Sequence, residues 1–333
     1  MKAAQIKKYS KKINVTICDI PIPTIKENEV LIKVKAAAVN PLDILNITGS
    51  VKLIQNYSMP LTLGNECSGI VEKIGTKVTG FQKGDFVYCR LPVNKIGAFA
   101  EYAAIESHAL AKMPQNYPFD VAAAIPLTGL TAYQGITEEL NAKPNQTLLI
   151  PGGSGSFGQM AVPIAKALGL HVIVTGNERA KESIISAGAE RYLNYKKEDY
   201  WKVLSEIDYV IDTLGAKEFE HELTVLKKGG RLLSLRNAPN KRFAEKNNLS
   251  FFKKQIFTLA GKKYDKAAAL QAKEYRFMFV RADGEQLKKI TDIVEKNQIL
   301  PPLDSRQFNL SEIETALELV ARGHTDGKVI IRF

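Results

Sequence analysis

The chain has 333 residues, of which 45% are hydrophobic and 24% charged, and its formal net charge is +11. This length is more than one hydrophobic core usually needs and fits two domains. The composition is that of a globular protein, and no segment reaches the roughly 18 uninterrupted apolar residues of a membrane-spanning helix. The basic first residues do not lead into an apolar segment with a cleavage site, so we expect no secretory signal and a cytoplasmic location.

The cysteines argue against disulfide and zinc-knuckle proteins, and the lysines leave RNA binding open. Cys18, Cys67 and Cys89 lack C-x-x-C spacing, which predicts reduced thiols and argues against a disulfide framework or a zinc knuckle. The lysines occur in scattered pairs, such as Lys253-Lys254, and not in one block. They indicate a solvated surface, although pairs that meet in three dimensions could form a patch that binds RNA.

The first 120 residues alternate short apolar runs with turn signals. Examples are EVLIKVKAAAV, SGIVEKIG and GDFVYCRL, with Gly-Asp, Lys-Gly and Pro between such runs. This pattern predicts a β-rich domain with antiparallel strands.

From Pro126 onward, predicted strands and helices alternate. A helix in TGLTAYQGITEEL precedes the strand TLLI, and the strands HVIVT and DYVIDTLG follow, with helices between them. Repeated β-α units predict an α/β fold with a doubly wound parallel sheet of six strands.

The last 60 residues differ again. They contain a predicted helix in GEQLKKITDIVEKNQI, a second helix from about Ser311, with Glu314 completing a capping box, and a final strand, KVIIRF. We expect this last strand to pair within the β-rich domain. That domain is then discontinuous, with residues 1–125 and 271–333, and the nucleotide domain comprises residues 126–270.

A glycine-rich turn gives the clearest functional signal. Gly153, Gly155 and Gly158 satisfy G-x-G-x-x-G between the strand TLLI and a helix from about Phe157. These glycines allow a tight turn, close approach of the backbone to a pyrophosphate, and close packing of helix on strand. The free N–H groups and partial positive charge of the helix N-terminus attract phosphates. The segment therefore predicts a dinucleotide site.

The end of the next strand indicates which dinucleotide. Gly176 stands where an acidic side chain would usually meet the ribose hydroxyls of NAD, and it leaves space for a 2′-phosphate. Arg179 or Lys181 could pair with that phosphate, which favours NADPH. Glu178 keeps a second interpretation open, because it could face solvent as a first-turn acid or reach the ribose and favour NADH.

Several further segments, in a fixed order, carry a family resemblance. They include AAAVNPLDILNITG at 36–49, PLTLGNECSGIVEKIG at 60–75, GAFAEYA at 97–103, IDTLG at 211–215 and GKVII at 327–331. With them the chain resembles the quinone oxidoreductase branch, including the zeta-crystallin-like proteins, of the medium-chain dehydrogenases and reductases. The resemblance implies a Rossmann NADP-binding domain, a GroES-like catalytic domain and a homodimer.

The zinc-dependent members of that family have ligands that this chain lacks. Asn40 stands where their first cysteine would be, Asn65 stands where their histidine would be, and only Cys89 lies where they have four cysteines. Zinc prefers thiolate and imidazole ligands, so we expect no metal. Without a Lewis acid, the resemblance implies an easier hydride transfer, to quinones or α,β-unsaturated carbonyls.

The resemblance also implies site residues. Asn40 would face the nicotinamide and bond the acceptor oxygen or the cofactor amide, or it caps a helix before Pro41, with Asp43 bonding nearby backbone. Thr128 and Thr131 match nicotinamide contacts, or their hydroxyls cap a helix.

Two tyrosines complete the expected site. Tyr57 could donate a hydrogen bond to an enolate oxygen, or it only packs. Tyr195 would lie by the adenosine phosphate, or likewise only packs. The expected catalytic residues are Asn40, Tyr57 and Thr128. The expected cofactor-binding residues are Asn40, Thr128, Thr131, Gly152, Gly153, Ser154, Gly155, Ser156, Phe157, Gly158, Thr175, Gly176, Asn177, Arg179, Lys181, Tyr195, Leu214 and Gly215.

These observations lead to one main hypothesis and two others. The main one is NADPH-dependent, metal-free reduction of quinones or enones by hydride transfer from nicotinamide C4. The second is a catalytically weak, nucleotide-bound protein that binds RNA or a protein partner. The third is a reductive step on a carrier-bound acyl chain.

Overall fold

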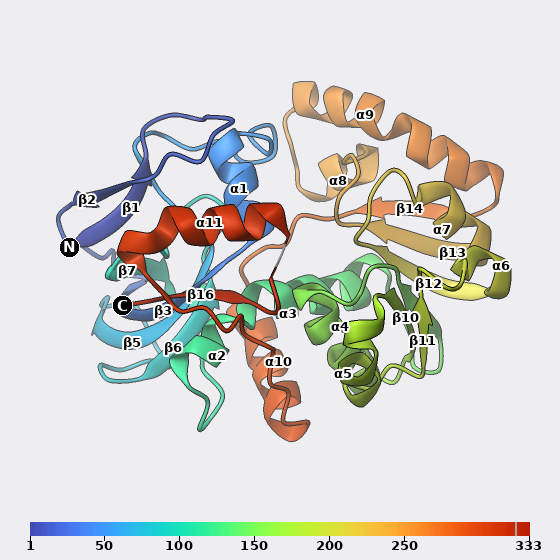
Figure 1. Ribbon diagram of the computed structural model, residues 1–333. Coiled ribbons are helices and arrows are strands. Elements are labelled where there is room, and N and C mark those ends of the chain that lie inside the picture. The colour runs from blue at the N-terminus through green and yellow to red at the C-terminus, as the bar shows by residue number, and fades with distance from the viewer. Residues whose placement is uncertain (324) are drawn as a thin grey trace. The chain divides into compact units, whose positions relative to one another are not determined.

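The computed structural model describes residues 1–323 and 325–333 and divides into two compact units (Figure 1). Unit 1 comprises Met1–Leu130 and Arg281–Phe333, and unit 2 comprises Thr131–Val280. Both boundaries lie later in the chain than the predicted ones. The second shift has a clear cause, because the strand β14 (Glu274–Phe277) lies beyond residue 270 and still pairs in the parallel sheet of unit 2.

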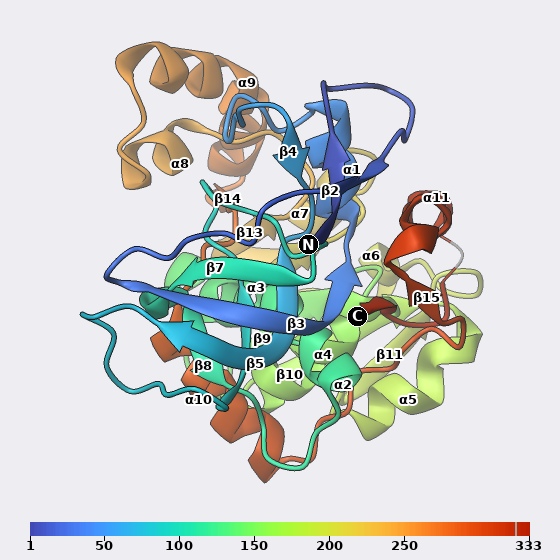
Figure 2. The same cartoon turned by 90° about the vertical axis from the view of Figure 1, so that its left-hand side faces the viewer.

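Unit 1 is organised around β3 (Glu29–Val39), a long and largely buried strand. One edge of β3 pairs with β5, and the other edge pairs with β7 near its start and with β16 near its end. Figure 2 shows β3 between β5 and β7. The other strands of this sheet are β5 (Glu66–Ile74), β6 (Phe86–Arg90), β7 (Tyr102–Glu106), β8 (Leu110–Lys112), β15 (Phe308–Asn309) and β16 (Val329–Arg332).

A smaller sheet and several helices complete unit 1. The smaller sheet has the order β2-β1-β4, with antiparallel pairs. The pairing of β16 with β3 confirms that the last strand belongs to the β-rich unit. The elements are β1 (Lys2–Ile6), β2 (Thr16–Asp19), β4 (Leu61–Thr62), α1 (Pro41–Thr48), α2 (Phe119–Ala123), α10 (Gly284–Lys296) and α11 (Ile313–Arg322), and α3 (Pro126–Gln134) crosses the unit boundary.

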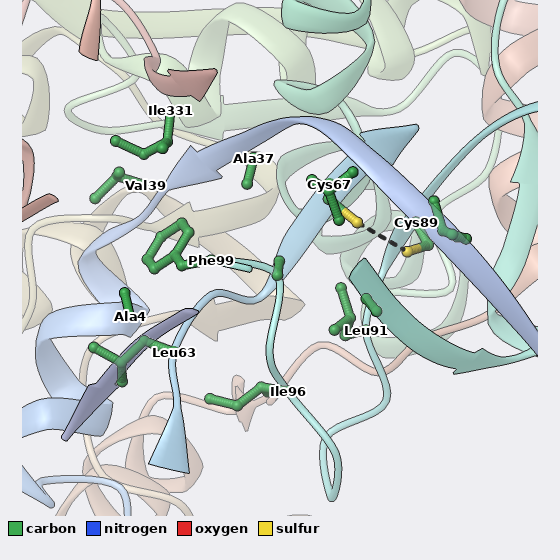
Figure 3. Packing of buried hydrophobic residues seen from close by; sticks show 14 of the residues in the cluster. Ala4, Ala37, Val39, Leu63, Cys67, Cys89, Leu91, Ile96, Phe99 and Ile331 are labelled. Carbon is green, nitrogen blue, oxygen red and sulfur yellow. Dashed lines mark hydrogen bonds between the residues drawn. The ribbon is translucent and has the colours of Figure 1, made fainter. Parts of the chain in front are cut away.

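The core of unit 1 is apolar and includes two cysteines. Figure 3 shows Cys67 on β5 beside Cys89 on β6, close to Ala37 of β3. The two sulfur atoms are 3.9 Å apart, and all three cysteines of the chain are free thiols, as the sequence predicts. Both buried thiols act as small apolar residues in this core.

The helix predicted from about Ser311 starts differently. A short 3₁₀ turn over Leu310–Glu312 precedes α11, and the capping box is formed by Asn309 and Glu312. The prediction of a Ser311–Glu314 box was therefore wrong. The Glu314 carboxylate instead accepts a hydrogen bond of 2.7 Å from the backbone N–H of Val15, which ties the helix to a distant loop.

Unit 2 contains the predicted six parallel strands. Their order is β11-β10-β9-β12-β13-β14, and every pair is parallel. From β9 the chain first adds β10 and β11 on one side of the sheet. It then adds β12, β13 and β14 on the other side of β9. The strands besides β14 are β9 (Thr147–Ile150), β10 (His171–Gly176), β11 (Arg191–Asn194), β12 (Ile207–Asp212) and β13 (Leu226–Ser234).

Helices cover both faces of this sheet. In Figure 1, α5 lies below the strands, and α8 and α9 lie above them. Right-handed crossovers that run outward in two directions place their helices on opposite faces. No helix of the described residues is long and apolar enough to cross a membrane. The helices are α4 (Ser156–Ala167), α5 (Lys181–Ser186), α6 (Tyr200–Val203), α7 (Phe219–Val225), α8 (Lys241–Lys246) and α9 (Phe251–Leu270).

Candidate active site

The predicted cofactor residues of unit 2 gather at one edge of its sheet. The glycine turn follows β9, Gly176 ends β10, Tyr195 follows β11, and Leu214 follows β12. Because these strands are parallel, their carboxyl ends meet at the same edge. The turn after β9 also stands where the strand order reverses, which is the position at which doubly wound sheets bind their ligands.

The glycines of the turn have different surroundings. A Cβ at Gly158 would collide with the carbonyl oxygen of Gly153, so α4 packs on the turn at a distance that only glycine allows. A Cβ at Gly155 would meet nothing within 4 Å, and no side chain caps α4, whose N-cap is Gly155. The turn thus combines close packing on one side with open space and uncapped N–H groups on the other, which fits a pyrophosphate.

Other predicted residues brace this turn. The backbone N–H of Gly152 donates a hydrogen bond of 3.1 Å to the Thr175 hydroxyl, and the Thr213 hydroxyl donates one of 2.7 Å to the carbonyl of Pro151. Thr175 is therefore a buried support for the turn. The predicted Ser154, Ser156 and Phe157 lie within the turn and the first residues of α4.

A tyrosine fills the space beside Gly176 that a side chain would take. A Cβ at Gly176 would collide with the Tyr192 hydroxyl, which donates a hydrogen bond of 2.5 Å to the carbonyl of Asn177. Burial raises the pKa of Tyr192 to about 12. Glycine is needed here because the tyrosine occupies the space that a side chain would take.

The acidic side chain of the segment after β10 is bonded to residues at and after the end of β11. The Glu178 carboxylate accepts hydrogen bonds from Asn194 (2.6 Å) and Lys197 (3.0 Å), and these bonds lower its pKa. Asn177 caps the following turn through its side chain. Arg179, Lys181 and Tyr195 are exposed on the same segment or beside it.

A buried carboxylate fixes the loop after β12. Asp212 accepts hydrogen bonds from the backbone N–H groups of Leu214 (2.8 Å) and Gly215 (2.6 Å) on one oxygen. Its other oxygen accepts from the Ser234 hydroxyl (2.6 Å) and the Asn237 amide (3.0 Å). Through these four hydrogen bonds Asp212 holds the Leu214–Gly215 loop.

A second buried carboxyl group, that of Glu222, makes the stability of the fold depend on pH. Burial, and then the nearby Asp212, raise the pKa of Glu222 to about 10. The folded protein therefore holds a proton that the unfolded chain releases near pH 4.5, so this group stabilises the fold fully below that pH and progressively less as the pH rises towards 10. We expect Glu222→Gln to lose less stability than the wild type between pH 6 and 9, by up to about 1.4 kcal/mol per pH unit. Urea unfolding at several pH values measures this, and parallel profiles of the two proteins would contradict it.

Unit 1 contains a buried polar network around an ammonium group. The Lys328 Nζ lies 2.8 Å from Glu66 Oε1 and donates a hydrogen bond of 2.6 Å to Asn40 Oδ1. The Asn40 amide nitrogen donates to the carbonyl of Ala38 (3.1 Å) and to Glu66 Oε1 (2.8 Å). The other Glu66 oxygen accepts from the backbone N–H of Leu127 at 2.6 Å. All of the side-chain partners are buried.

Asp43 extends this network through α1. Its carboxyl accepts hydrogen bonds from the backbone N–H of Asn40 (2.8 Å) and from the Asn65 amide (2.6 Å). Burial raises the pKa of Asp43 to about 7, although both bonds oppose that shift. The structural interpretation of Asn40 as the N-cap before Pro41 is thus correct, and both hydrogens of its amide are used within unit 1.

The remaining predicted residues have local partners. The Thr128 hydroxyl donates to the carbonyls of Ala124 (3.2 Å) and Ile125 (3.4 Å) and does not cap a helix start. Thr131 is half-buried on α3. Tyr57 is buried, its hydroxyl donates to the carbonyl of Val93 at 2.9 Å, and burial raises its pKa.

The sequence analysis missed Lys328 and Arg90. Both are buried cations of unit 1, and burial lowers the pKa of Arg90 to about 10, so that it remains charged at neutral pH. Lys328 directly precedes the buried strand β16, and Arg90 ends β6. A charged residue at the end of an apolar run is usually exposed, so the pattern of these runs did not predict buried cations. The GKVII segment, which contains Lys328, indicated a family resemblance and no role for the lysine.

Comparisons with known proteins agree with this architecture. Residues 26–115 match the alcohol dehydrogenase GroES-like domain, and residues 187–331 match a domain described as zinc-binding dehydrogenase. A GroES-like unit joined to a doubly wound nucleotide sheet defines a two-domain dehydrogenase or reductase.

Relatives that align over most of the chain identify the family. The 2-methylene-furan-3-one reductase of Solanum lycopersicum is 29% identical over 94% of this chain and 74% of its own length. The mitochondrial NAD(P)H oxidoreductase RTN4IP1 of Mus musculus is 30% identical over 91% of this chain and 81% of its own. The quinone oxidoreductase structure from Coxiella burnetii has a TM-score of 0.83, with 28% identity over 100% of this chain and 99% of that one. The chain belongs to the medium-chain dehydrogenase/reductase family.

The donor set of unit 1 does not fit the zinc of that family. Of Asn40, Asn65 and Glu66, only Glu66 is a usual zinc ligand, and its carboxylate is bonded to the Lys328 ammonium and two further donors. Within residues 1–323 and 325–333, no group of three His, Cys, Asp or Glu side chains could hold a metal ion. An ammonium group thus supplies the positive charge of this network.

Proposed function

We propose that this protein reduces quinones or α,β-unsaturated carbonyls with NADPH and without zinc. The observation that carries the proposal is the glycine turn at the point where the strand order reverses, in a chain whose Asn40 and Glu66 are bonded to Lys328. NADPH supplies a hydride from C4 of its nicotinamide when it is bound. The relatives named as an enone reductase and a quinone oxidoreductase support the acceptor class.

The chain's own residues have three tasks in this reaction. The turn and the N-terminus of α4 bind the pyrophosphate, and Asp212 holds the Leu214–Gly215 loop beside that turn. The network of Asn40, Glu66 and Lys328 fixes the backbone of unit 1 around α1. Quinones and enones need no Lewis acid, because the charge that develops on hydride transfer spreads onto a carbonyl oxygen.

The preference for NADPH has its own test. Arg179 and Lys181 are exposed on the segment that follows β10, which supports contacts of these two cations with a 2′-phosphate. We expect the double variant Arg179→Ala with Lys181→Ala to bind NADPH about 10- to 100-fold more weakly, because charge-assisted bonds are lost, with little change for NADH. Fluorescence titration measures both affinities, with Lys202→Ala as a control for lost surface charge. Equal losses for NADPH and NADH would argue against this role.

The proposal includes a homodimer and a cytoplasmic location. One edge of β14 pairs with β13, and within the described residues no strand pairs with its other edge. Such an edge can pair with a second copy. Light scattering of the purified protein tests the dimer. The location rests on the sequence alone and is tested by imaging the tagged full chain.

The reaction is tested by following NADPH consumption against quinones, 2-alkenals, cyclic enones and furanones, with identification of the products. We expect turnover with at least one of these classes of acceptor, and we expect this activity to be retained after treatment with a zinc chelator. NADPH binding without any turnover, together with salt-sensitive RNA binding, would instead favour the nucleotide-bound RNA-binding alternative.

A further inference from the structure

Arg90 is the one buried cation of this network without a bonded counter-ion among the described residues. It ends β6, directly opposite Glu66 on β5, and its side chain is fully buried. Nη1 donates to the carbonyl of Leu91, whereas Nε and Nη2 have no hydrogen-bond partner in the part of the chain that the structure describes. A buried guanidinium with unused donors is costly, so these donors call for a partner from outside the chain.

The unused donors form one edge of the guanidinium group. Nη2 lies on the same side as the Nε hydrogen, so Nε–H and one Nη2–H run parallel and point the same way. This edge matches the lone pairs of an oxygen that carries negative charge. Arginine does not lose its proton at neutral pH, so the edge can only donate.

The neighbouring carboxyl groups make no hydrogen bond to this edge among the described residues. The Glu66 carboxylate is occupied by Lys328, Asn40 and the Leu127 backbone, and Asp43 by Asn40 and Asn65. Lys328 is paired with Glu66, whereas Arg90 keeps its charge at neutral pH and Asp43 is partly protonated there. The network therefore has an excess of positive charge that an anion would balance.

The donors that the sequence suggested for the acceptor oxygen are already used. Both Asn40 amide hydrogens are bonded within unit 1, and the Tyr57 hydroxyl donates to Val93. Arg90 is close enough to Tyr57 for its charge to act on the pKa of that phenol. Among these three residues, only Arg90 still has hydrogens to donate.

We propose that the Nε–Nη2 edge of Arg90 is an oxyanion site, which binds the carbonyl oxygen of the acceptor as that oxygen becomes negatively charged. This proposal rests on the proposed function. With an enone, the β-carbon gains a hydride, the C=C electron pair moves to the bond beside the carbonyl carbon, and the carbonyl π pair moves onto oxygen, while NADPH is oxidised to NADP⁺. Water then protonates the α-carbon and gives the saturated carbonyl compound. Arg90 stabilises the enolate more than the neutral acceptor and so lowers the barrier.

The segment that carries Tyr57 is an irregular loop close to Arg90. Residues 50–60, between α1 and β4, form neither a helix nor a strand. Tyr57 and Gln55 are buried within it, and both polar atoms of the Gln55 amide also lack a partner among the described residues. A loop of this kind can shift more readily than a strand when a ligand enters.

The test uses 4-nitrophenol, whose phenolate resembles the enolate oxygen, and the cofactor-free protein. We expect the wild type to bind the phenolate and to lower the apparent pKa of bound 4-nitrophenol by about 1 to 2 units, seen as the phenolate absorption band. Arg90→Gln should weaken phenolate binding about 100-fold, and Arg90→Lys should weaken it less, because the charge remains and the paired edge is lost. The matched control is Arg231→Gln, which removes another arginine whose Nε makes no hydrogen bond, in unit 2, where it is paired with Glu274.

Two outcomes would overturn the proposal. One is Arg90→Gln, folded by circular dichroism, binding the phenolate as the wild type does. The other outcome is used if Arg90→Gln does not fold. In that case the proposal is overturned if Arg90→Lys binds the phenolate with wild-type affinity and the apparent pKa of bound 4-nitrophenol is the same as in the wild type. Phenolate binding that depends on Arg90, in a protein inert toward every quinone and enone, would reject the proposed function and keep the anion site. Turnover of a quinone or enone, together with phenolate binding that does not depend on Arg90, would keep the proposed function and reject the anion site.

Discussion

Lys328→Met is expected to lower the free energy of unfolding of unit 1 by about 3–5 kcal/mol. The ammonium group is buried and is bonded to Glu66 and Asn40, so methionine leaves the Glu66 carboxylate buried without its counter-ion. Urea unfolding, followed by circular dichroism, measures the loss. The double variant Lys328→Met with Glu66→Gln should recover part of it, because the unpaired charge is then also removed.

A matched control separates burial from the loss of any lysine. Lys83 pairs with Glu72 at 2.9 Å in the same unit, but both side chains are exposed. We expect Lys83→Met to cost less than about 1 kcal/mol. A similar small loss for Lys328→Met would contradict the buried network described above.

Gly158→Ala is expected to weaken NADPH binding by about 100-fold or more. The new Cβ would collide with the backbone of Gly153, so either α4 or the turn must move, and misplacement by about 1 Å can cost two orders of magnitude. Overpacking should also cost about 1–3 kcal/mol of stability. Fluorescence titration with NADPH and thermal unfolding measure the two effects.

Gly155→Ala is the control for this prediction. It adds the same methyl group two residues into the motif, where nothing lies within 4 Å of the new Cβ. We expect its stability to stay within about 0.5 kcal/mol of the wild type. If Gly158→Ala bound NADPH as tightly as the wild type, the close packing of α4 on the turn would have no role in the cofactor site.

The sequence predicted the parts of the molecule that depend on apolar periodicity and glycine. Buried parallel strands are nearly continuous apolar runs, so HVIVT and DYVID were recognisable as β10 and β12. Gly153, Gly155 and Gly158 identified the turn because their spacing reflects backbone geometry. The last strand was assigned to the β-rich unit because a strand that follows the nucleotide domain must pair somewhere, and the β-rich domain was the favoured acceptor.

The parts that the sequence did not predict depend on contacts between distant residues. Lys328 and Glu66 are far apart in the chain, and only the pairing of β16 with β3 and of β3 with β5 brings them together. Gly176 was read as empty space because its neighbour Tyr192 is on another strand. The boundary was predicted near residue 270 because the sequence pattern changes there, whereas β14 lies beyond it and pairs with β13 in the parallel sheet.

The most direct test of the proposed function is transfer of an isotope label from the cofactor. The protein, with its zinc content measured after treatment with a chelator, is incubated with NADPH deuterated at C4 and a simple enone such as 4-hexen-3-one, and the product is examined by NMR. We predict a saturated ketone with deuterium at the β-carbon, formed by zinc-free protein. A product with no deuterium at that carbon, or a reaction that occurs only when zinc is present, would contradict the proposal.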